Sequence, residues 1–505
     1  MLVEDQTVGP EDARPASAAE APLVPRGALW GWGTLGLIGS ALSAYAGTRL
    51  IGGGNAIRWW FHAPIPSSHE ASKIVFWAGV AALCGAWLGL GITLRRAPAG
   101  VSLKALWIIG AAWCLPFLLG PPLFSHDVYS YIAQGTLVHL GHSPYHEAPI
   151  ALGHLGHRHV LDGVDPFWRK TTAPYGPLFL GGVSLIVGVA GSHLVLDAVL
   201  VRLFDMIGIV LLAIFAPRLA RAVGGDPRRA LWLAMLSPLV WLQLVSNAHN
   251  DALMVGLMVA GVTLALTRRP LLGIAVCAVA ATVKVPAAAA IVFIAVAWAR
   301  DLPGRTEKLN AVVKAALVAV AVAGIVTAVT GLGLAWISTG LFSTPGRVRL
   351  AITPATAVGY TIAHALHGVG VPLNGKQFEA TLSHVTFAIT AVLALALLYG
   401  TRWENMVRRL GWLLIAIAIG GPAAWPWYFT WGLALLAACP GIQFSRLIPL
   451  AVVASAFIVI PTGQLALPLG TSPEMVVFYL LVLAAAGWYW WWRRRPRRAA
   501  MLASP

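Results

Sequence analysis

Charged residues are scarce in this 505-residue chain: Asp, Glu, Lys and Arg together make up only 11% of it. Soluble domains usually carry about a quarter of charged residues, so the composition argues against a cytosolic enzyme. Hydrophobic residues reach 58%, and a mean hydropathy of +0.76 shows that the apolar excess is general. Apolar windows of about 20 residues recur, each long enough to cross a ~30 Å hydrocarbon layer. The sequence therefore predicts a polytopic membrane protein.

Cysteine is also rare, with four in the whole chain. Cys84, Cys114 and Cys277 lie within apolar segments and Cys439 at the end of one. This placement supports neither a disulfide framework nor a zinc site.

The formal net charge is +16, but the basic residues cluster in short loops and in the tail after residue 492. That distribution is typical of cytoplasmic anchoring on an anionic leaflet, not of nucleic-acid binding.

Composition divides the chain into three parts. Residues 1–28, rich in Ala, Pro and acidic side chains, are predicted to be a disordered cytoplasmic tail. Residues 29–492 are predicted to form an all-α membrane domain with about 14 crossings. Residues 493–505 are predicted to be a basic cytoplasmic tail. The positive charge of the loop before the third span places that loop in the cytoplasm, so the long polar segments 124–176 and 336–377 are expected outside.

Two apolar stretches leave the topology open. The 177–217 stretch is either two spans or one span with a half-span, and the 271–299 stretch is either one long span or two, broken at residues 284–286. One net crossing for the first and two for the second keep the neighbouring arginines in the cytoplasm, so we prefer this interpretation. It also brings the polar segment 247–251 to the outer side, facing the loop 124–176.

Carboxylates number 19, few enough to be considered one by one. Asp127 stands out because it begins a helical pattern directly after Pro121 and Pro122 close a span. The pattern predicts an amphipathic helix along the outer membrane surface, with Tyr129 and Tyr131 near the headgroups. A carboxylate there lies close to lipid yet is reachable from water, which suits a general base that takes a proton from a hydroxyl. The alternative is that Asp127 merely caps this helix.

Other charges fall at membrane depth. Arg202 precedes Asp205 by one helical turn, and we expect a structural ion pair between them. The segment 247–251 holds four polar residues in five, a costly arrangement in a membrane that indicates a functional site. Lys284 interrupts an apolar run, where it either neutralises a phosphate, pairs with Asp251 or snorkels to the surface.

The outer segments carry further candidates. Arg347 and Arg349 are two residues apart and suited to clamp a lipid phosphate, with general headgroup contact as the alternative. Seven of the 14 histidines lie between residues 126 and 159, but their spacing matches no zinc pattern. The segment 425–428, Trp-Pro-Trp-Tyr, is expected to form an outer aromatic corner.

Five short segments follow one another between residues 126 and 286: HDVYSYIAQG at 126–135, SPY at 143–145, PYGP at 174–177, AHNDAL at 248–253 and VKVP at 283–286. Together they resemble the polyprenol-phosphate-mannose-dependent α(1→6)-mannosyltransferases of actinobacteria. The resemblance implies the GT-C architecture, a bundle of membrane helices with an external catalytic loop. It also implies a lipid-linked mannosyl phosphate donor, a lipid-anchored mannoside acceptor and, as product, the mannan backbone of lipomannan and lipoarabinomannan. The family's loop aspartate corresponds to Asp127.

We therefore predict that Asp127 is the general base of an inverting mannosyl transfer. The candidate substrate-binding residues are His126, Tyr129, Tyr131, Gln134, Tyr145, Tyr175, His249, Asn250, Asp251, Lys284, Arg347 and Arg349. A lipid donor explains why no nucleotide-binding glycine loop is needed, and the scheme requires neither a metal nor another cofactor.

Three alternatives remain open from the sequence. They are a transporter or flippase for a polyprenyl-linked sugar, a related enzyme that moves arabinofuranose, and a structural scaffold of the envelope machinery. The lack of an internal repeat and the loop that carries Asp127 weigh against a transporter. The expected location is the bacterial plasma membrane, with the active site on the periplasmic or extracellular side. The expected partners are the lipid donor, the mannoside acceptor and membrane lipids, without nucleic acid.

Overall fold

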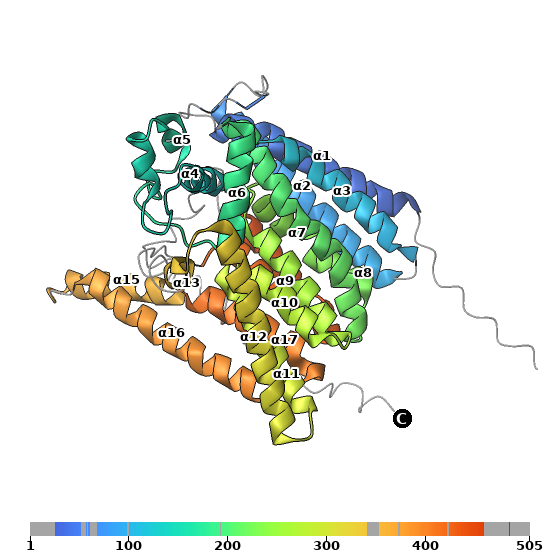
Figure 1. Ribbon diagram of the computed structural model, residues 1–505. Coiled ribbons are helices and arrows are strands. Elements are labelled where there is room, and N and C mark those ends of the chain that lie inside the picture. Colours follow the sequence, from blue (N-terminus) through green and yellow to red (C-terminus); the bar gives the residue numbers. More distant parts are fainter. Residues whose placement is uncertain are drawn as a thin grey trace, which may run out of the picture.

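A computed structural model describes residues 26–51, 57, 59–60, 68–97, 100–191, 193–340, 353–371, 374–421, 424–458 and 484. Over these residues the chain forms helices and turns with no strand, which confirms the all-α prediction (Figure 1). The predictions for the N-terminal tail before residue 26, for Arg347 and Arg349 and for the basic tail lie outside the described residues.

The helices lie close to the predicted apolar windows. In chain order they are α1 (Arg26–Ile51), α2 (His69–Arg96), α3 (Leu103–Leu119), α4 (Asp127–His139), η2 (Pro149–Gly153), α5 (Arg158–Gly163), α6 (Pro177–Ala190), α7 (Leu194–Ala222), α8 (Pro227–Ala234), η3 (Val240–Val245), α9 (Asp251–Leu266), α10 (Pro270–Ala281), η4 (Val285–Ala287), α11 (Ala288–Asp301), α12 (Arg305–Thr330), α13 (Ala335–Ser338), α15 (Pro354–Gly368), α16 (Gly375–Tyr399), α17 (Trp403–Gly420), η6 (Pro426–Tyr428), α18 (Phe429–Leu436), α19 (Pro440–Gln443) and α20 (Leu447–Ala456).

Several helices present apolar side chains outward, as a membrane protein requires. Within the described ranges, four segments are long and apolar enough to span a bilayer: His69–Arg96, Leu194–Ala222, Arg305–Thr330 and Gln377–Tyr399. On α12, Val320 is 71% exposed, and on α16, Phe387 is 67% exposed. Apolar side chains on such surfaces are stable in contact with lipid hydrocarbon, whereas exposing them to water would cost free energy. The chain is a membrane protein.

The two ambiguous stretches are each divided into two helices. Residues 177–217 form a helical hairpin in which the left-handed Gly191 ends α6 and the ring of Phe179 stacks on that of Phe204, with centroids 6.1 Å apart. Because α6 has 14 residues and is about 21 Å long, it suits a half-span beside the full-length α7. Residues 271–299 divide into α10 and α11 at 284–286, which confirms the expected break.

Two further apolar windows, 230–246 and 426–440, have the composition of single spans, but the helix is interrupted within each of them. In 230–246, α8 ends at Ala234 and a π-helical turn, η3, follows Pro238. In 426–440, a 3₁₀ turn begins at Pro426 and the helix that follows has eight residues. Proline lacks the N–H that continues a helix, whereas a hydropathy window measures composition and not continuity.

Figure 1 shows α1, α2 and α3 side by side along one flank and α7, α9 and α10 in the middle. At one end of this bundle, α4 and α5 lie beside α6, whereas α15 and α16 extend away from it. A close helix contact joins α7 and α9: a Cβ on Gly208 would lie 2.0 Å from the carbonyl oxygen of Ala252. Small residues allow such approach, which positions the first turn of α9 and with it Asp251.

We predict that Gly208→Val pushes α7 and α9 apart. Overpacking of this kind lowers the free energy of unfolding by about 1–3 kcal/mol. Gly85→Val is the matched control, because Gly85 is exposed on α2 and a Cβ there meets no atom within 4 Å. Thermal unfolding of the two detergent-solubilised variants measures the difference. Equal midpoints would contradict the proposed α7–α9 contact.

Candidate active site

Helix α4 carries the candidate base at its first residue. The Ser125 hydroxyl accepts a hydrogen bond from the backbone N–H of Asp127 at 3.1 Å, whereas Asp127 is not the residue that caps the helix. The alternative role of Asp127 as a helix cap is therefore not supported. The prediction of a surface helix is also wrong, because every residue from Val128 to Leu137 is buried. The helix packs against α5, α6, α7 and η2, and a helical pattern does not distinguish cover by lipid from cover by protein.

The two tyrosines of α4 point inward and not toward headgroups, which corrects their predicted placement. The Tyr129 hydroxyl accepts a hydrogen bond from Trp59 Nε1 at 3.1 Å. The Tyr131 hydroxyl lies 3.2 Å from His249 Nδ1, and its ring meets that of Tyr175 edge-on with centroids 4.8 Å apart. Tyr131 thus faces the polar segment 247–251, as the preferred topology requires.

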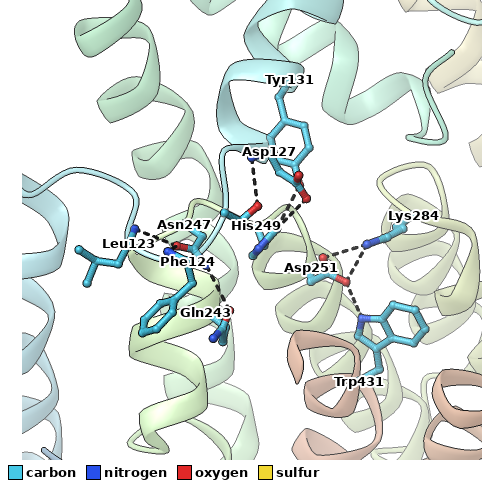
Figure 2. Close-up of polar contacts among 11 residues, drawn as sticks. Leu123, Phe124, Asp127, Tyr131, Gln243, Asn247, His249, Asp251, Lys284 and Trp431 are labelled. Carbon is cyan, nitrogen blue, oxygen red and sulfur yellow. Dashed lines mark hydrogen bonds and ion pairs between the residues drawn. The ribbon is translucent and has the colours of Figure 1, made fainter. Parts of the chain in front are cut away.

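An asparagine side chain joins this polar segment to the start of the loop. Asn247 Oδ1 accepts hydrogen bonds from the backbone N–H groups of Leu123 at 3.1 Å and Phe124 at 2.8 Å (Figure 2). Its Nδ2 donates to Gln243 Oε1 at 3.2 Å. The next residue, Ala248, has φ of 52°, a left-handed conformation that is unfavourable for alanine. The chain therefore turns sharply here, directly before His249.

Asp127 and His249 meet where these two segments converge. Asp127 Oδ2 lies 3.6 Å from His249 Nδ1, with the aspartate side chain 15% exposed and the histidine side chain fully buried. The His249 ring stacks on Trp427 with centroids 4.0 Å apart. Burial raises the pKa of Asp127 to about 6, although the Ser125 hydrogen bond and Lys284 oppose this shift. A carboxylate with this pKa accepts a proton readily near neutral pH.

An ion pair lies next to this contact, at the Asp251 end of the segment 247–251 (Figure 2). Lys284 Nζ donates to Asp251 Oδ1 and Oδ2, both at 2.9 Å, so the pairing with Asp251, one of the three predicted roles, is confirmed. Trp431 Nε1 donates to Asp251 Oδ1 at 2.5 Å. The Lys284 ammonium also lies 4.8 Å from the ring centre of Tyr428. Aromatic faces and a carboxylate therefore hold this cation at the break between α10 and α11.

Two other predicted residues support the site through the loop. The Tyr145 hydroxyl donates to the Tyr175 carbonyl at 3.0 Å, and the Lys284 ammonium lies 5.9 Å from the Tyr175 ring centre. The loop backbone at Gly176 passes close to the end of α10, because a Cβ on Gly176 would lie 2.0 Å from the Thr282 carbonyl oxygen. Glycine is thus required where the loop passes the end of α10.

The remaining predicted residues, His126, Gln134 and Asn250, make fewer polar contacts in the site. The ring of His126 lies 6.0 Å from that of Tyr129. Gln134 and Asn250 are buried, and neither Gln134 Oε1 nor either amide atom of Asn250 has a hydrogen-bond partner within the described part of the chain. Over the same ranges no group of three His, Cys, Asp or Glu side chains is placed to hold a metal ion.

The predicted ion pair between Arg202 and Asp205 is wrong. Arg202 Nη1 donates to the backbone carbonyls of Leu118 at 2.8 Å and Gly120 at 2.9 Å. Its Nη2 donates to the backbone carbonyl of Ser246 at 2.6 Å. The last carbonyls of a helix lack intrahelical donors, and those at the end of α3 attract the guanidinium instead. The Asp205 carboxylate is buried without a hydrogen-bond partner among the described residues.

The sequence predicted that Trp427 belongs to an outer aromatic corner but did not point to either Trp427 or Trp431 as part of the candidate site. Both belong to the site: Trp427 covers His249, and Trp431 binds Asp251. Their separation of four residues, one helical turn, was the signal that both rings share a face.

The chain matches two protein-family models. Residues 31–300 match the model described as alpha-(1->6)-mannopyranosyltransferase, N-terminal domain, and residues 355–491 match the MptB C-terminal domain. The first covers more than half of the chain. The chain belongs to this family. It is therefore a mannosyltransferase family member and a glycosyltransferase, which favours an enzyme over the transporter and scaffold alternatives.

Curated relatives agree with this membership. Alpha-(1->6)-mannopyranosyltransferase A of Mycobacterium tuberculosis is 36% identical, over 72% of this chain and 71% of that protein. Alpha-(1->6)-mannopyranosyltransferase A of Corynebacterium glutamicum is 32% identical, over 53% of this chain and 58% of that protein. Alpha-(1->6)-mannopyranosyltransferase B of the same organism is 29% identical, over 80% and 71%. No solved structure matches the chain.

The buried pair in this mannosyltransferase leads to a stability prediction. Lys284→Met leaves the Asp251 carboxylate buried without its cation, which costs about 3–5 kcal/mol of unfolding free energy. The double variant Lys284→Met with Asp251→Asn recovers much of that loss, because no uncompensated charge remains. Thermal unfolding in detergent is the measurement.

Lys73→Met serves as the control for that experiment. It breaks the exposed Lys73–Glu70 pair, in which the side chains are 47% and 77% exposed, and such pairs contribute less than about 1 kcal/mol. A Lys284→Met variant no less stable than this control would show that the buried pair contributes little.

Proposed function

We propose that this protein transfers mannose from polyprenyl-phosphate-mannose to a lipid-anchored α(1→6)-mannoside, extending the mannan backbone of lipomannan and lipoarabinomannan. Family membership supports the mannosyl transfer and the α(1→6) linkage. A donor with a lipid chain suits an active site enclosed by apolar helices, and positive-inside topology supports a site on the periplasmic side of the plasma membrane. The proposal includes no metal and no other cofactor.

One observation carries the mechanism: a carboxylate with a pKa near 6 lies partly exposed at the start of α4. In the proposed step, Asp127 takes the proton from the acceptor 6-hydroxyl as that oxygen attacks the anomeric carbon. The bond from this carbon to the phosphate breaks on the opposite face, so the configuration inverts. A positioned base contributes about 10²–10⁴-fold to such a reaction.

The charge that grows on the leaving phosphate requires a cation nearby. Lys284 suits this role in the proposal, because an ammonium has three N–H donors and two of them bind Asp251. The third N–H remains for a phosphate oxygen, and the Lys284 side chain is 13% exposed. The roles assigned to Arg347 and Arg349, which lie outside the described residues, stay predictions.

Asp127→Asn tests the base directly. The amide keeps the shape of the side chain but cannot take a proton, so we expect product formation to fall at least 100-fold. The assay uses purified protein in liposomes with labelled polyprenyl-phosphate-mannose and a mannoside acceptor. Asp162→Asn is the matched control, since Asp162 is an exposed aspartate of the same loop. Normal transfer by the Asp127→Asn variant would remove the catalytic assignment.

The raised pKa of Asp127 also predicts a pH dependence. The base acts only when ionised, so kcat/KM is expected to fall about tenfold per pH unit as the pH drops below about 6 and to level off above it. A pH profile of the wild-type enzyme in liposomes checks this. An acidic limb centred near pH 4 would mean that the working carboxylate is an ordinary, solvated one.

A further inference from the structure

His249 contacts the proposed base from its buried side. The imidazole Nδ1 lies between two oxygens, 3.2 Å from the Tyr131 hydroxyl and 3.6 Å from Asp127 Oδ2. Its Nε2 is buried and has no partner among the described residues. We propose that His249 is a positioning residue, which orients the Asp127 carboxylate and favours its ionised form. This inference rests on the proposed function of Asp127.

The chemistry of the ring selects one tautomer. Burial lowers the pKa of His249, which lies in the connection between η3 and α9, well below its usual value, so the ring is neutral and carries one N–H. A carboxylate only accepts hydrogen bonds, so an N–H on Nδ1 matches both neighbouring oxygens. The other tautomer would turn a nitrogen lone pair toward the carboxylate and leave an N–H buried at Nε2 without an acceptor.

Contacts from three parts of the chain hold the ring in this place. Trp427 covers one face of the ring at 4.0 Å, with an angle of 20° between the planes. Asn247 binds the backbone that leads to Asp127, and Arg202 binds the Ser246 carbonyl. A separation of 3.6 Å is long for a hydrogen bond, and such contacts commonly shorten when substrate binds.

Other groups also act on the protonation of Asp127. Lys284 and the Ser125 hydroxyl favour its ionised form, whereas Asp251 and Asp165 disfavour it. The further titratable groups on the segments packed against α4 and around the site include His126, Arg158, His159, Asp162, Tyr175, Asp197, Arg202, Asp205 and Tyr428. All of these remain when His249 alone is replaced, so a comparison of two variants at that position isolates its contribution.

The test compares His249→Asn with His249→Gln in the liposome assay. The asparagine amide occupies the place of Nδ1 and keeps a donor toward Asp127, whereas the longer glutamine amide occupies the place of Nε2. We expect the Asn variant to keep kcat within a few-fold and its acidic limb near pH 6. We expect the Gln variant to lose about 10- to 100-fold in kcat, with the limb moved up by about one pH unit and little change in donor KM.

Several results would overturn the proposal. If the acidic side of the pH profile does not move in the Gln variant while the KM for the donor rises, His249 would instead bind the donor phosphate. Equal behaviour of the two amide variants would make its role only structural. Should both amides fail to fold, Trp427→Leu keeps the imidazole and removes its cover, and an unmoved limb and kcat in that variant would also refute the proposal.

The outcome for Asp127 is separable from that for His249. If Asp127→Asn transfers mannose normally, the proposed base fails, and with it the role of His249. If Asp127→Asn is inactive while the two amide variants behave alike, the proposed function stands and only the positioning role fails.

Discussion

The site depends on one amide side chain that binds two distant segments together. Asn247 Oδ1 accepts from two consecutive backbone N–H groups, at Leu123 and Phe124, just before the helix that carries Asp127. Asn247 itself stands two residues before His249 and four before Asp251. Because each of these hydrogen bonds is buried, leaving its groups unpaired is costly, and this cost holds the two halves of the site in register.

Buried charge is the second constraint on this membrane protein. Lys284 is neutralised by Asp251 and surrounded by aromatic rings, and Arg202 is neutralised by backbone carbonyls and not by a carboxylate. Each arrangement satisfies N–H donors where water is scarce. The site's polar groups also contact aromatic side chains: Trp427 stacks on His249, and Trp431 Nε1 donates a hydrogen bond to Asp251.

Interrupted helices supply side chains that meet at the candidate site. The π-helical turn η3 after Pro238, the break at Lys284 and the short turn η6 at Pro426 all expose backbone or polar side chains inside an apolar bundle. Irregular backbone at membrane depth is tolerated where protein covers it or a cavity needs it. The three interruptions contribute His249, Lys284 and Trp427, which is why the polar groups gather at one place.

Composition and pattern alone determined that this chain is an all-α membrane protein, predicted a break at 284–286 and singled out Asp127 and the segment 247–251 as candidate site residues, because apolar length and misplaced charge are local properties. Tertiary structure decided what covers each face. A helical period is the same whether lipid or protein lies against it, so α4 was expected at the surface and is buried. Hydrogen-bond partners are likewise decided by the tertiary structure. Arg202 donates to backbone carbonyls of other segments and not to the nearby Asp205. Trp431 donates to Asp251, which is 180 residues away in the sequence.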